Sequence, residues 1–370
     1  MIAKAVAMIG VGAVVAAALI WAGWRESADA LEPTALPSPT SAPTGVEYRG
    51  LAIPIQSGYK PVETFTPLLH EVAEQGANTV LFSTPGFMEH AESQKIFIEA
   101  RKTPAAEEFE TLIRRARERG LRVIVMPIVL LTHPRGSEWR GVIKPPDWDE
   151  WWEQYREFVV YIANIARDGG AEVMIVGSEL VSTEKYTDQW VRTIEKVRAH
   201  FPQGKLGYSA NWDHYKPVDF WDKLDFIGMT TYYKLADKKN PTVDEIVAYW
   251  RPIHREVTAW QRRVGKPLLL TEVGWCSQEG AAMAPWNYYQ NMKATPAGHE
   301  EQRRLYEAFL KVWDGTPGLA GVVWWEWTGA PGGPTDYNYT PKNKPAQQLL
   351  QRWFAENNRA AAAETTPASP

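Results

Sequence analysis

Apolar runs alternate with amphipathic segments along most of the chain, from about residue 47 to about residue 356. Short apolar runs bounded by turn-forming residues are typical of buried strands. Eight such runs predict strands at residues 48–55, 78–84, 122–131, 172–180, 205–211, 224–233, 267–275 and 319–327. The runs are apolar at nearly every position rather than at alternate ones, which favours a parallel sheet covered on both faces.

Segments with apolar residues near a 3.6-residue spacing lie between the predicted strands. Such spacing predicts helices that present one apolar face to a core. The clearest examples are residues 105–120, 148–170, 188–201, 243–265 and 298–315. Strands and helices therefore alternate along the chain, which predicts an α/β fold.

A (β/α)8 TIM barrel accounts best for eight strands with intervening helices in a region of about 310 residues. The main alternative is an open doubly wound sheet, which usually carries a glycine-rich GxGxxG turn near its first strand. The corresponding stretch here, GLAIPIQSG (50–58), lacks that pattern. We therefore predict one barrel domain over residues 47–357.

The two ends of the chain differ in composition from the barrel region. Residues 1–30 carry one lysine, a long apolar stretch and a small-x-small triplet, which predicts an export signal peptide or a membrane anchor. Residues 31–46 are rich in Pro, Ser and Thr and predict an extended linker. Residues 358–370 predict a disordered tail. The export signal predicts a secreted or periplasmic protein, with membrane anchoring as the alternative.

The composition of the chain indicates which classes of ligand the protein is expected to bind. The formal net charge of −4 gives no electrostatic reason to bind nucleic acid or an anionic surface. With Cys276 as the one cysteine and seven scattered histidines, no disulfide, metal site or cofactor is expected. The chain has 18 Trp and 15 Tyr, many near predicted strand ends, and aromatic faces that stack on sugar rings explain this better than core packing alone.

Two glutamates stand at the ends of predicted strands. Glu179 follows the apolar residues of VMIVGSEL (173–180), and Glu272 lies in LLLTEVGW (268–275). Side chains at the carboxyl ends of barrel strands face one site. A carboxylate pair cleaves glycosidic bonds with retention at a separation of about 5–5.5 Å and with inversion at about 6.5–9.5 Å. Each glutamate alone could instead cap a helix or pair with an arginine, but two of them beside aromatic residues favour catalysis.

Several motifs resemble those of clan A glycoside hydrolases, which are retaining barrels with glutamates on strands four and seven. The resemblance is closest to glycoside hydrolase family 113, whose characterised members are endo-β-1,4-mannanases. The motifs are EWRGVIKP (138–145), VGSEL (176–180), YSANWD (208–213), FWDKLDFIGMTTYYKL (220–235), LLLTEVGW (268–275), APWN (284–287) and GVVWWEW (321–327). The resemblance covers about residues 48–356 and is more specific for the fold and the two glutamates than for the sugar.

The resemblance implies that Glu179 is the acid/base and Glu272 the nucleophile. It also implies that a tyrosine, Tyr232 or Tyr233, donates a hydrogen bond to the nucleophile. A tryptophan, Trp325 or Trp327, would form the floor under the sugar, and both remain open because alternate residues of a strand share a face. The remaining residues suggested as sugar-binding are Trp139, Arg140, Asn211, Trp212, Trp275 and Trp286.

Two positions leave alternatives open. Many clan A enzymes have an asparagine directly before the acid/base, where it binds the sugar 2-hydroxyl, but this chain has Ser178. Either Asn211 or another group takes that role, or the sugar preference differs. Arg140 either holds a sugar hydroxyl or carboxylate or pairs with an acidic residue of the surface.

We predict a retaining glycoside hydrolase that cleaves β-1,4-linked polysaccharide by double displacement, with β-mannan as the first candidate and endo action expected. A non-catalytic carbohydrate-binding barrel and a cell-envelope transglycosylase are the alternatives. The expected partner is an oligosaccharide or polysaccharide, and we expect a monomer.

Overall fold

The computed structural model describes residues 46–365 of the 370-residue chain. Eight strands form a closed barrel in which each strand pairs with the next and β8 pairs in parallel with β1. The strands are β1 (Tyr48–Pro54), β2 (Thr79–Met88), β3 (Arg122–Leu131), β4 (Val173–Ser178), β5 (Lys205–Ala210), β6 (Phe226–Thr230), β7 (Leu268–Val273) and β8 (Leu319–Trp324). The prediction of a (β/α)8 TIM barrel is confirmed.

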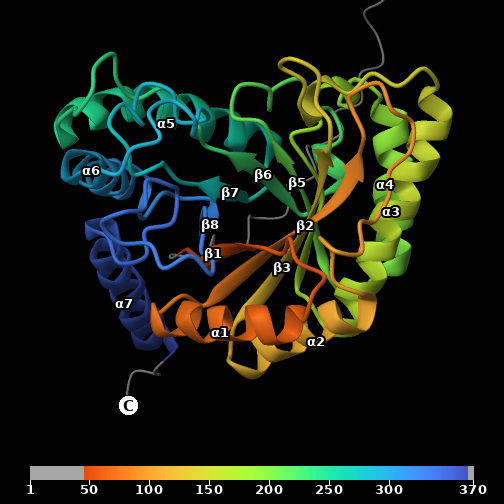
Figure 1. The fold of residues 1–370 in the computed structure, drawn as a ribbon, viewed down its shortest axis with the longest axis horizontal. Helices are drawn as coiled ribbons and strands as arrows, with labels where there is room; N and C mark the ends of the chain where they lie inside the picture. The colour runs from red at the N-terminus through yellow and green to blue at the C-terminus, as the bar shows by residue number, and fades with distance from the viewer. Residues whose placement is uncertain (1–45, 366–370) are drawn as a thin grey trace, which may run out of the picture. The chain divides into compact units, whose positions relative to one another are not determined.

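Seven α-helices of the described region surround the strands. They are α1 (Pro61–Glu74), α2 (Ala106–Glu118), α3 (Trp148–Gly169), α4 (Thr187–His200), α5 (Val243–Val264), α6 (Pro296–Trp313) and α7 (Pro345–Thr365). Helices α3 and α4 cover one side of the barrel and α5, α6 and α7 the other (Figure 1). The connection from β5 to β6 contains a short 3-10 helix, η3 (Trp221–Lys223), and no α-helix. Two further 3-10 helices, η1 (Arg140–Val142) and η2 (Val181–Thr183), follow β3 and β4.

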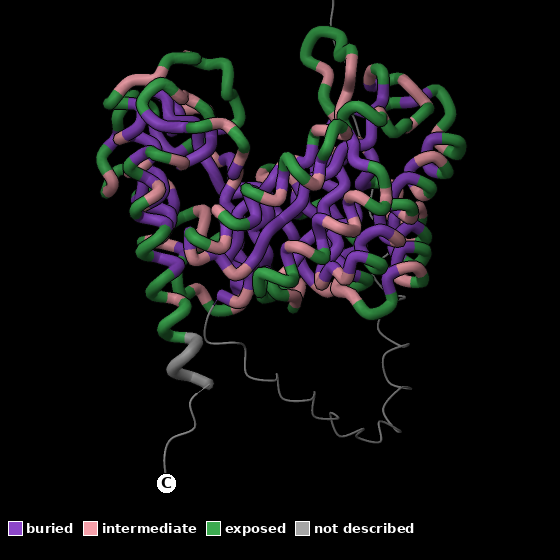
Figure 2. The backbone as a smooth tube through the Cα atoms, turned by 60° about the horizontal axis from the view of Figure 1, so that its bottom comes forward, coloured by how far each residue is buried: buried purple, intermediate pink, exposed green. Residues whose placement is uncertain are grey.

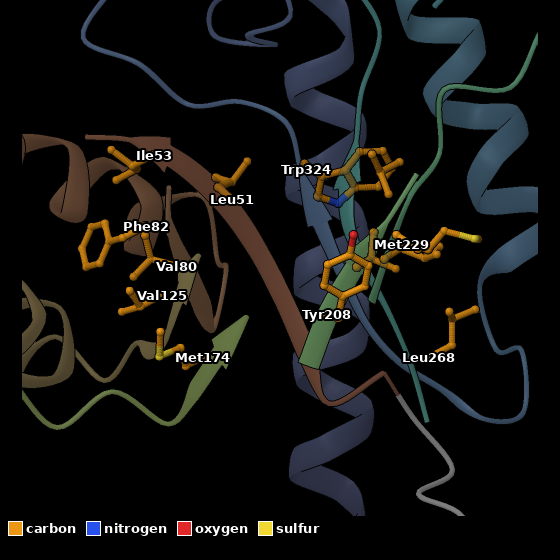
Figure 3. Packing of buried hydrophobic residues seen from close by; sticks show 14 of the residues in the cluster. Leu51, Ile53, Val80, Phe82, Val125, Met174, Tyr208, Met229, Leu268 and Trp324 are labelled. Carbon is orange, nitrogen blue, oxygen red and sulfur yellow. The ribbon is translucent and has the colours of Figure 1, made fainter. Parts of the chain in front are cut away.

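The core has two layers separated by the barrel wall. The inner layer consists of strand residues alone, among them Leu81, Ile124 and Leu269. The outer layer lies between the strands and the helices, and Figure 3 shows Val80 and Phe82 among its members. Buried residues follow the strands and exposed residues follow the loops (Figure 2). The unbroken apolar runs of the sequence reflect this burial on both faces of each strand.

Local signals fix the ends of the long helices. The Asp147 carboxylate accepts hydrogen bonds from the backbone N–H groups of Asp149 and Glu150 and so begins α3. Thr242 begins α5 through a reciprocal capping box with the residue three positions later. Both helices end at a glycine with positive φ, 80° at Gly170 and 73° at Gly265, where a side chain would be strained. These signals explain why the predicted helix limits agree closely with the structure.

A polar cluster holds the strands together at the N-terminal end of the barrel. The Tyr48 hydroxyl donates a 2.7 Å hydrogen bond to Glu172, and the Arg122 guanidinium lies 4.1 Å from the centre of the Tyr48 ring. The active site is therefore expected at the opposite end of the barrel, where the C-terminal ends of the strands lie, as in other TIM barrels.

Helix α7 extends beyond the point where the sequence predicted a disordered tail. The tail was expected from residue 358, but α7 continues to Thr365. Asn358 accepts a 2.8 Å hydrogen bond from Arg49 and donates one of 2.9 Å to the Gly76 carbonyl. Four consecutive alanines follow, and alanine has the highest helix propensity.

The predicted export signal or anchor at residues 1–30 lies outside the described residues, as does nearly all of the predicted linker at 31–46. None of the helices within residues 46–365 is both long and apolar enough to cross a membrane.

Candidate active site

A cavity of about 730 Å³ lies where the C-terminal ends of β4 to β8 meet the loops that follow the strands. It contains both predicted glutamates and seven of the ten predicted sugar-binding residues. The lining residues are Trp139, Arg140, Glu179, Asn211, Trp212, Asp213, Tyr232, Glu272, Trp286, Tyr288, Trp325 and Tyr339.

A β-bulge lies close to each glutamate. Between β4 and β5 the register gains one residue in β4 before Ser178, and Glu179 follows directly. Between β6 and β7 the register gains one residue in β7 between Leu270 and Glu272. Leu268 and Leu270 belong to the outer layer, so strict alternation would aim Glu272 at the helices. The bulge changes that alternation and lets Glu272 face the cavity.

The Glu179 carboxylate is held at both oxygens. Thr230, the last residue of β6, donates a 2.9 Å hydrogen bond to Glu179 Oε1. Arg140 Nη2 forms a 2.5 Å ion pair with Glu179 Oε2. Glu179 has a φ of 54°, in the left-handed region that non-glycine residues seldom adopt. The surrounding structure therefore determines where this carboxylate lies.

The Glu272 carboxylate is 3% exposed and accepts a 2.8 Å hydrogen bond from the Tyr232 hydroxyl. Burial and, second, the negative charge of Glu179 raise the pKa of Glu272 to about 7. Arg140 and the Tyr232 hydrogen bond act in the opposite direction.

Arg140 connects the β3–α3 loop to the end of β4. Its Nε donates a 3.2 Å hydrogen bond to the Ser178 carbonyl while Nη2 binds Glu179. The side chain is 18% exposed. The ring of Trp139 packs against Gly141, where a Cβ atom would lie 2.2 Å from it. Arg140 thus pairs with an acidic residue of the cavity, which is neither a sugar contact nor the surface pairing that the sequence left open.

Aromatic side chains form the walls of the cavity. Trp212 and Trp286 stack with ring centres 5.6 Å apart and an interplanar angle of 19°. Trp286 is 48% exposed and Trp139 is 37% exposed. Flat, partly exposed indole rings beside a polar centre suit the apolar faces of pyranose rings.

Buried polar contacts order the loops that carry these aromatics. Glu301 of α6 is fully buried and accepts hydrogen bonds from the backbone N–H groups of Asn240, Gly280 and Ala282. Lys344 has no exposed side chain and bonds to Asp336 and Ser277, which joins the β8–α7 loop to the β7–α6 loop. The cavity walls are therefore fixed to the barrel.

Three of the predicted sugar-binding residues lie outside the cavity lining, namely Trp275, Trp327 and Tyr233. Trp275 is fully buried and packs on Tyr306 in the outer layer, because it shares a strand face with the outward-facing Val273. Trp327 is 1% exposed and donates a 2.8 Å hydrogen bond to Glu71 of α1. The cavity is instead lined by Trp325.

Of the two candidate tyrosines, Tyr232 bonds to Glu272, whereas Tyr233 does not line the cavity. The Tyr233 ring packs edge-on against Trp212 at 5.0 Å and so supports a cavity wall from behind.

Asp213, Tyr288 and Tyr339 line the cavity but were missed by the sequence reasoning. Asp213 lies inside the YSANWD motif, and its position beside Asn211 was a signal that could have identified it. Tyr288 and Tyr339 lie on long loops with no periodic pattern. Nothing in the sequence distinguishes these two tyrosines from others in the chain.

The residue before Glu179 does not face the cavity. Ser178 is 1% exposed, and its hydroxyl is buried without a hydrogen-bond partner among the described residues. Asn211 lines the cavity and donates a 2.7 Å hydrogen bond to Asp213. Within residues 46–365 no cluster of three or more His, Cys, Asp or Glu side chains is arranged to hold a metal ion.

Comparison with known proteins gives a family match over most of the chain. The model of Glycoside Hydrolase Family 113 matches residues 56–356. No curated protein sequence matches the chain significantly.

Solved structures of similar fold include a family 113 β-mannanase from Alicyclobacillus acidocaldarius in complex with ManMIm. It is 26% identical, covers 84% of this chain and 97% of its own, and has a TM-score of 0.74. A family 113 β-1,4-mannanase that is 24% identical covers 84% and 99%, also with a TM-score of 0.74. The endo-β-1,4-mannanase from Thermotoga petrophila, 12% identical, covers 88% and 79% with a TM-score of 0.57 and shares the fold.

The predicted family resemblance is thus confirmed by a match that covers β2 to β8 and all of the cavity residues. The chain belongs to glycoside hydrolase family 113 and is a glycoside hydrolase.

Proposed function

We propose that the protein is a retaining endo-β-1,4-mannanase that uses Glu179 as acid/base and Glu272 as nucleophile. The observation that carries the proposal is the meeting of these two carboxyls in one aromatic-lined cavity, each fixed by its own partners. The 26% identical β-mannanase of the same family supports the substrate class.

In the first step, Glu272 attacks the anomeric carbon while Glu179 gives its proton to the departing oxygen. The bond between the anomeric carbon and that oxygen breaks, and a glycosyl ester of Glu272 forms. In the second step, Glu179 takes a proton from water, which attacks the same carbon and releases Glu272. Two inversions leave the configuration unchanged.

The charges of the cavity suit this chemistry. Glu179, Glu272 and Asp213 face Arg140, so acidic side chains outnumber the basic one. The transition state for glycoside cleavage carries positive charge on the sugar ring. Fixed negative groups stabilise such charge without reorganising.

The aromatic walls support binding of a chain rather than of one small sugar. Trp139 is on the β3–α3 loop and Trp286 on the β7–α6 loop, so exposed indole faces approach the glutamates from different parts of the rim. This distribution supports action within a polymer. We also propose that residues 1–30 direct export, since polysaccharide is met outside the cell.

The roles of the two glutamates are tested with single substitutions and two substrates. Glu272→Ala is expected to abolish hydrolysis of both β-1,4-mannan and an activated dinitrophenyl β-mannobioside. Glu179→Ala should lose mannan hydrolysis yet release a burst of dinitrophenol, because that leaving group departs without an acid.

The stereochemistry is read by NMR of the first-formed product, which should be the β-anomer. Near-normal turnover in both variants, or a first-formed α-anomer, would overturn the proposal. Products of mixed lengths from the start of the reaction are expected for endo action, whereas release of one short product alone would contradict it.

A further inference from the structure

A line of buried hydrogen bonds runs from the edge of the β5–β6 loop to the backbone beside Glu179. His214 Nδ1 lies 2.6 Å from Glu184 Oε2, and the Tyr208 hydroxyl donates a 2.6 Å hydrogen bond to Glu184 Oε1. The backbone N–H of Leu180 in turn donates a 3.1 Å hydrogen bond to the Tyr208 oxygen. Leu180 directly follows Glu179 in the chain. None of Tyr208, Glu184 and His214 lines the cavity.

The interior of this line is closed to solvent. Tyr208 is fully buried and Glu184 is 1% exposed, whereas the His214 side chain is 38% exposed. The Tyr208 ring packs edge-on against Trp190 at 4.9 Å and Phe220 at 5.3 Å, which leaves its hydroxyl little freedom. A buried polar group without a hydrogen-bond partner lowers the stability of the folded protein. The Tyr208 hydroxyl and the Glu184 carboxylate are therefore held in the positions where they bond to each other.

Both amide groups that flank the Cα atom of Glu179 are bound to β5. The Glu179 N–H donates a 2.8 Å hydrogen bond to the Ser209 carbonyl, and the Leu180 N–H is held by the side chain of the preceding residue, Tyr208. These two bonds fix the peptide planes on either side of the Cα atom. They hold Glu179 at its φ of 54°, a conformation that a glutamate does not prefer. The direction of the Glu179 side chain follows from those planes.

We propose that Tyr208, oriented by Glu184, is a positioning residue that aims the Glu179 carboxyl at the glycosidic oxygen. This inference rests on the acid/base role proposed for Glu179. Tyr208 does not touch the substrate and acts through the Leu180 amide.

The consequence for catalysis depends on the leaving group. A mispositioned Glu179 slows the step in which its proton passes to the departing oxygen as the bond to the anomeric carbon breaks. Sugar alcohols need that proton, but dinitrophenolate leaves without it. Loss of positioning therefore slows cleavage of mannan more than cleavage of the activated substrate.

The test removes one hydroxyl and compares two substrates. Tyr208→Phe keeps the packed ring and leaves the Leu180 N–H without its partner. We expect kcat/KM for mannan to fall about tenfold or more, and kcat/KM for dinitrophenyl β-mannobioside to fall less than about threefold. The loss on mannan should be in kcat, with KM unchanged, because the cavity walls are intact.

Tyr155→Phe is the matched control. Tyr155 is also a buried tyrosine whose hydroxyl bonds to a carbonyl of β4, that of Val176, at 2.7 Å. It contacts the strand before Glu179 but not the amides that flank it. We expect this variant to change the two kcat/KM values by the same small factor.

Glu184→Gln is a second, milder variant for use if Tyr208→Phe does not fold. Its amide oxygen can still accept from Tyr208, but it no longer satisfies His214 as a carboxylate does. We expect the same preference for loss on mannan, at a few fold. Thermal unfolding of each variant shows that the assays were made on folded protein.

Equal losses on both substrates in the Tyr208 and Glu184 variants would overturn the inference, as would unchanged activity. A substrate-dependent loss in Tyr155→Phe would overturn it too, since any buried hydroxyl near β4 would then have the effect. These outcomes differ from a failure of the proposed function. In that case the unsubstituted protein would not cleave either substrate, or Glu179→Ala would not show the leaving-group dependence of a missing acid.

Discussion

Arg140 and Glu179 form a 2.5 Å ion pair in the lining of the cavity, so the guanidinium is paired with the carboxylate that follows β4 and not with the one on β7. The β7 carboxylate, Glu272, has a neutral partner, the Tyr232 hydroxyl. The two glutamates are therefore distinguished by their partners before any substrate arrives. In the proposed mechanism this arrangement has consequences for catalysis, for pH dependence and for stability.

Replacement of Arg140 tests the contribution of the ion pair. Arg140→Ala leaves Glu179 buried without its cation and removes the bond to the Ser178 carbonyl. We expect kcat/KM on mannan to fall about 100-fold, equivalent to about 3 kcal/mol. Arg140→Lys should recover part of that loss, because an ammonium keeps the charge but cannot bind both partners as the guanidinium does. Equal kcat/KM values for the Ala and Lys variants would contradict this role.

Removal of the Tyr232 hydroxyl should move the pH profile. The hydrogen bond from Tyr232 lowers the pKa of Glu272, and Glu272 must be ionised to act as nucleophile. Tyr232→Phe therefore raises the pKa of Glu272, and the acidic limb of kcat/KM against pH should shift upward by about one unit. The matched control is Tyr233→Phe, whose hydroxyl does not bond to Glu272. An unchanged acidic limb in Tyr232→Phe would sink the assignment.

Neutralisation of Glu272 should stabilise the protein at high pH. The folded-state pKa of Glu272, about 7, lies above its ordinary value of 4.5, so the folded state binds more protons between these pH values. Stability from this group is present below about pH 4.5 and is lost as pH rises to about 7. Glu272→Gln should therefore be more stable than the unsubstituted protein above pH 7, by about 3 kcal/mol.

The measurement is the midpoint of thermal unfolding, which should be several degrees higher for Glu272→Gln at pH 8 and equal at pH 4. Glu157→Gln on the exposed face of α3 serves as control and should show no such pH-dependent difference. If Glu272→Gln were less stable than the unsubstituted protein at pH 8, the claim that the buried charge of Glu272 is destabilising would be wrong.

Substitutions of two tryptophans should distinguish an effect on sugar binding from an effect on core packing. Trp286 is 48% exposed and Trp275 is fully buried. Trp286→Ala should raise KM for mannan about tenfold through loss of a stacking surface, with little change in thermal unfolding. Trp275→Ala should instead lower stability by about 3–5 kcal/mol through the cavity it leaves. If Trp286→Ala left KM unchanged, the proposed sugar-binding wall would be wrong.

The barrel could be predicted because its signal is repeated along the whole sequence. Eight apolar runs with amphipathic segments between them leave few other folds, and caps such as Asp147 and glycines such as Gly265 mark helix ends locally. The two glutamates could be predicted as neighbours because parallel strands end at one rim. These features could be predicted because each depends on a short pattern of neighbouring residues in the sequence.

Side-chain direction near the strand ends could not be predicted in the same way. A bulge shifts every later residue to the other face, and no residue type announces it. Trp275 therefore packs outward. Trp325 and Trp327 lie in the loop after β8, where alternation no longer holds, so that Trp325 lines the cavity while Trp327 bonds to Glu71 of α1. Tyr288 and Tyr339 reach the site from loops whose paths depend on tertiary contacts such as those of Lys344.

The extra residue in β7 has a consequence for how this scaffold can vary. Exchanging one aliphatic side chain for another at Leu270 alters packing by a small amount, but the chain length between Leu270 and Glu272 sets which way the carboxyl points. If the same residues paired without the bulge, a barrel could still close with its nucleophile turned into the hydrocarbon layer under the helices, whereas deletion of Thr271 would restore plain alternation and keep the carboxyl on the cavity side. The pairing of β7 with β6, more than the identity of the aliphatic side chains, therefore decides whether this barrel has its nucleophile in place.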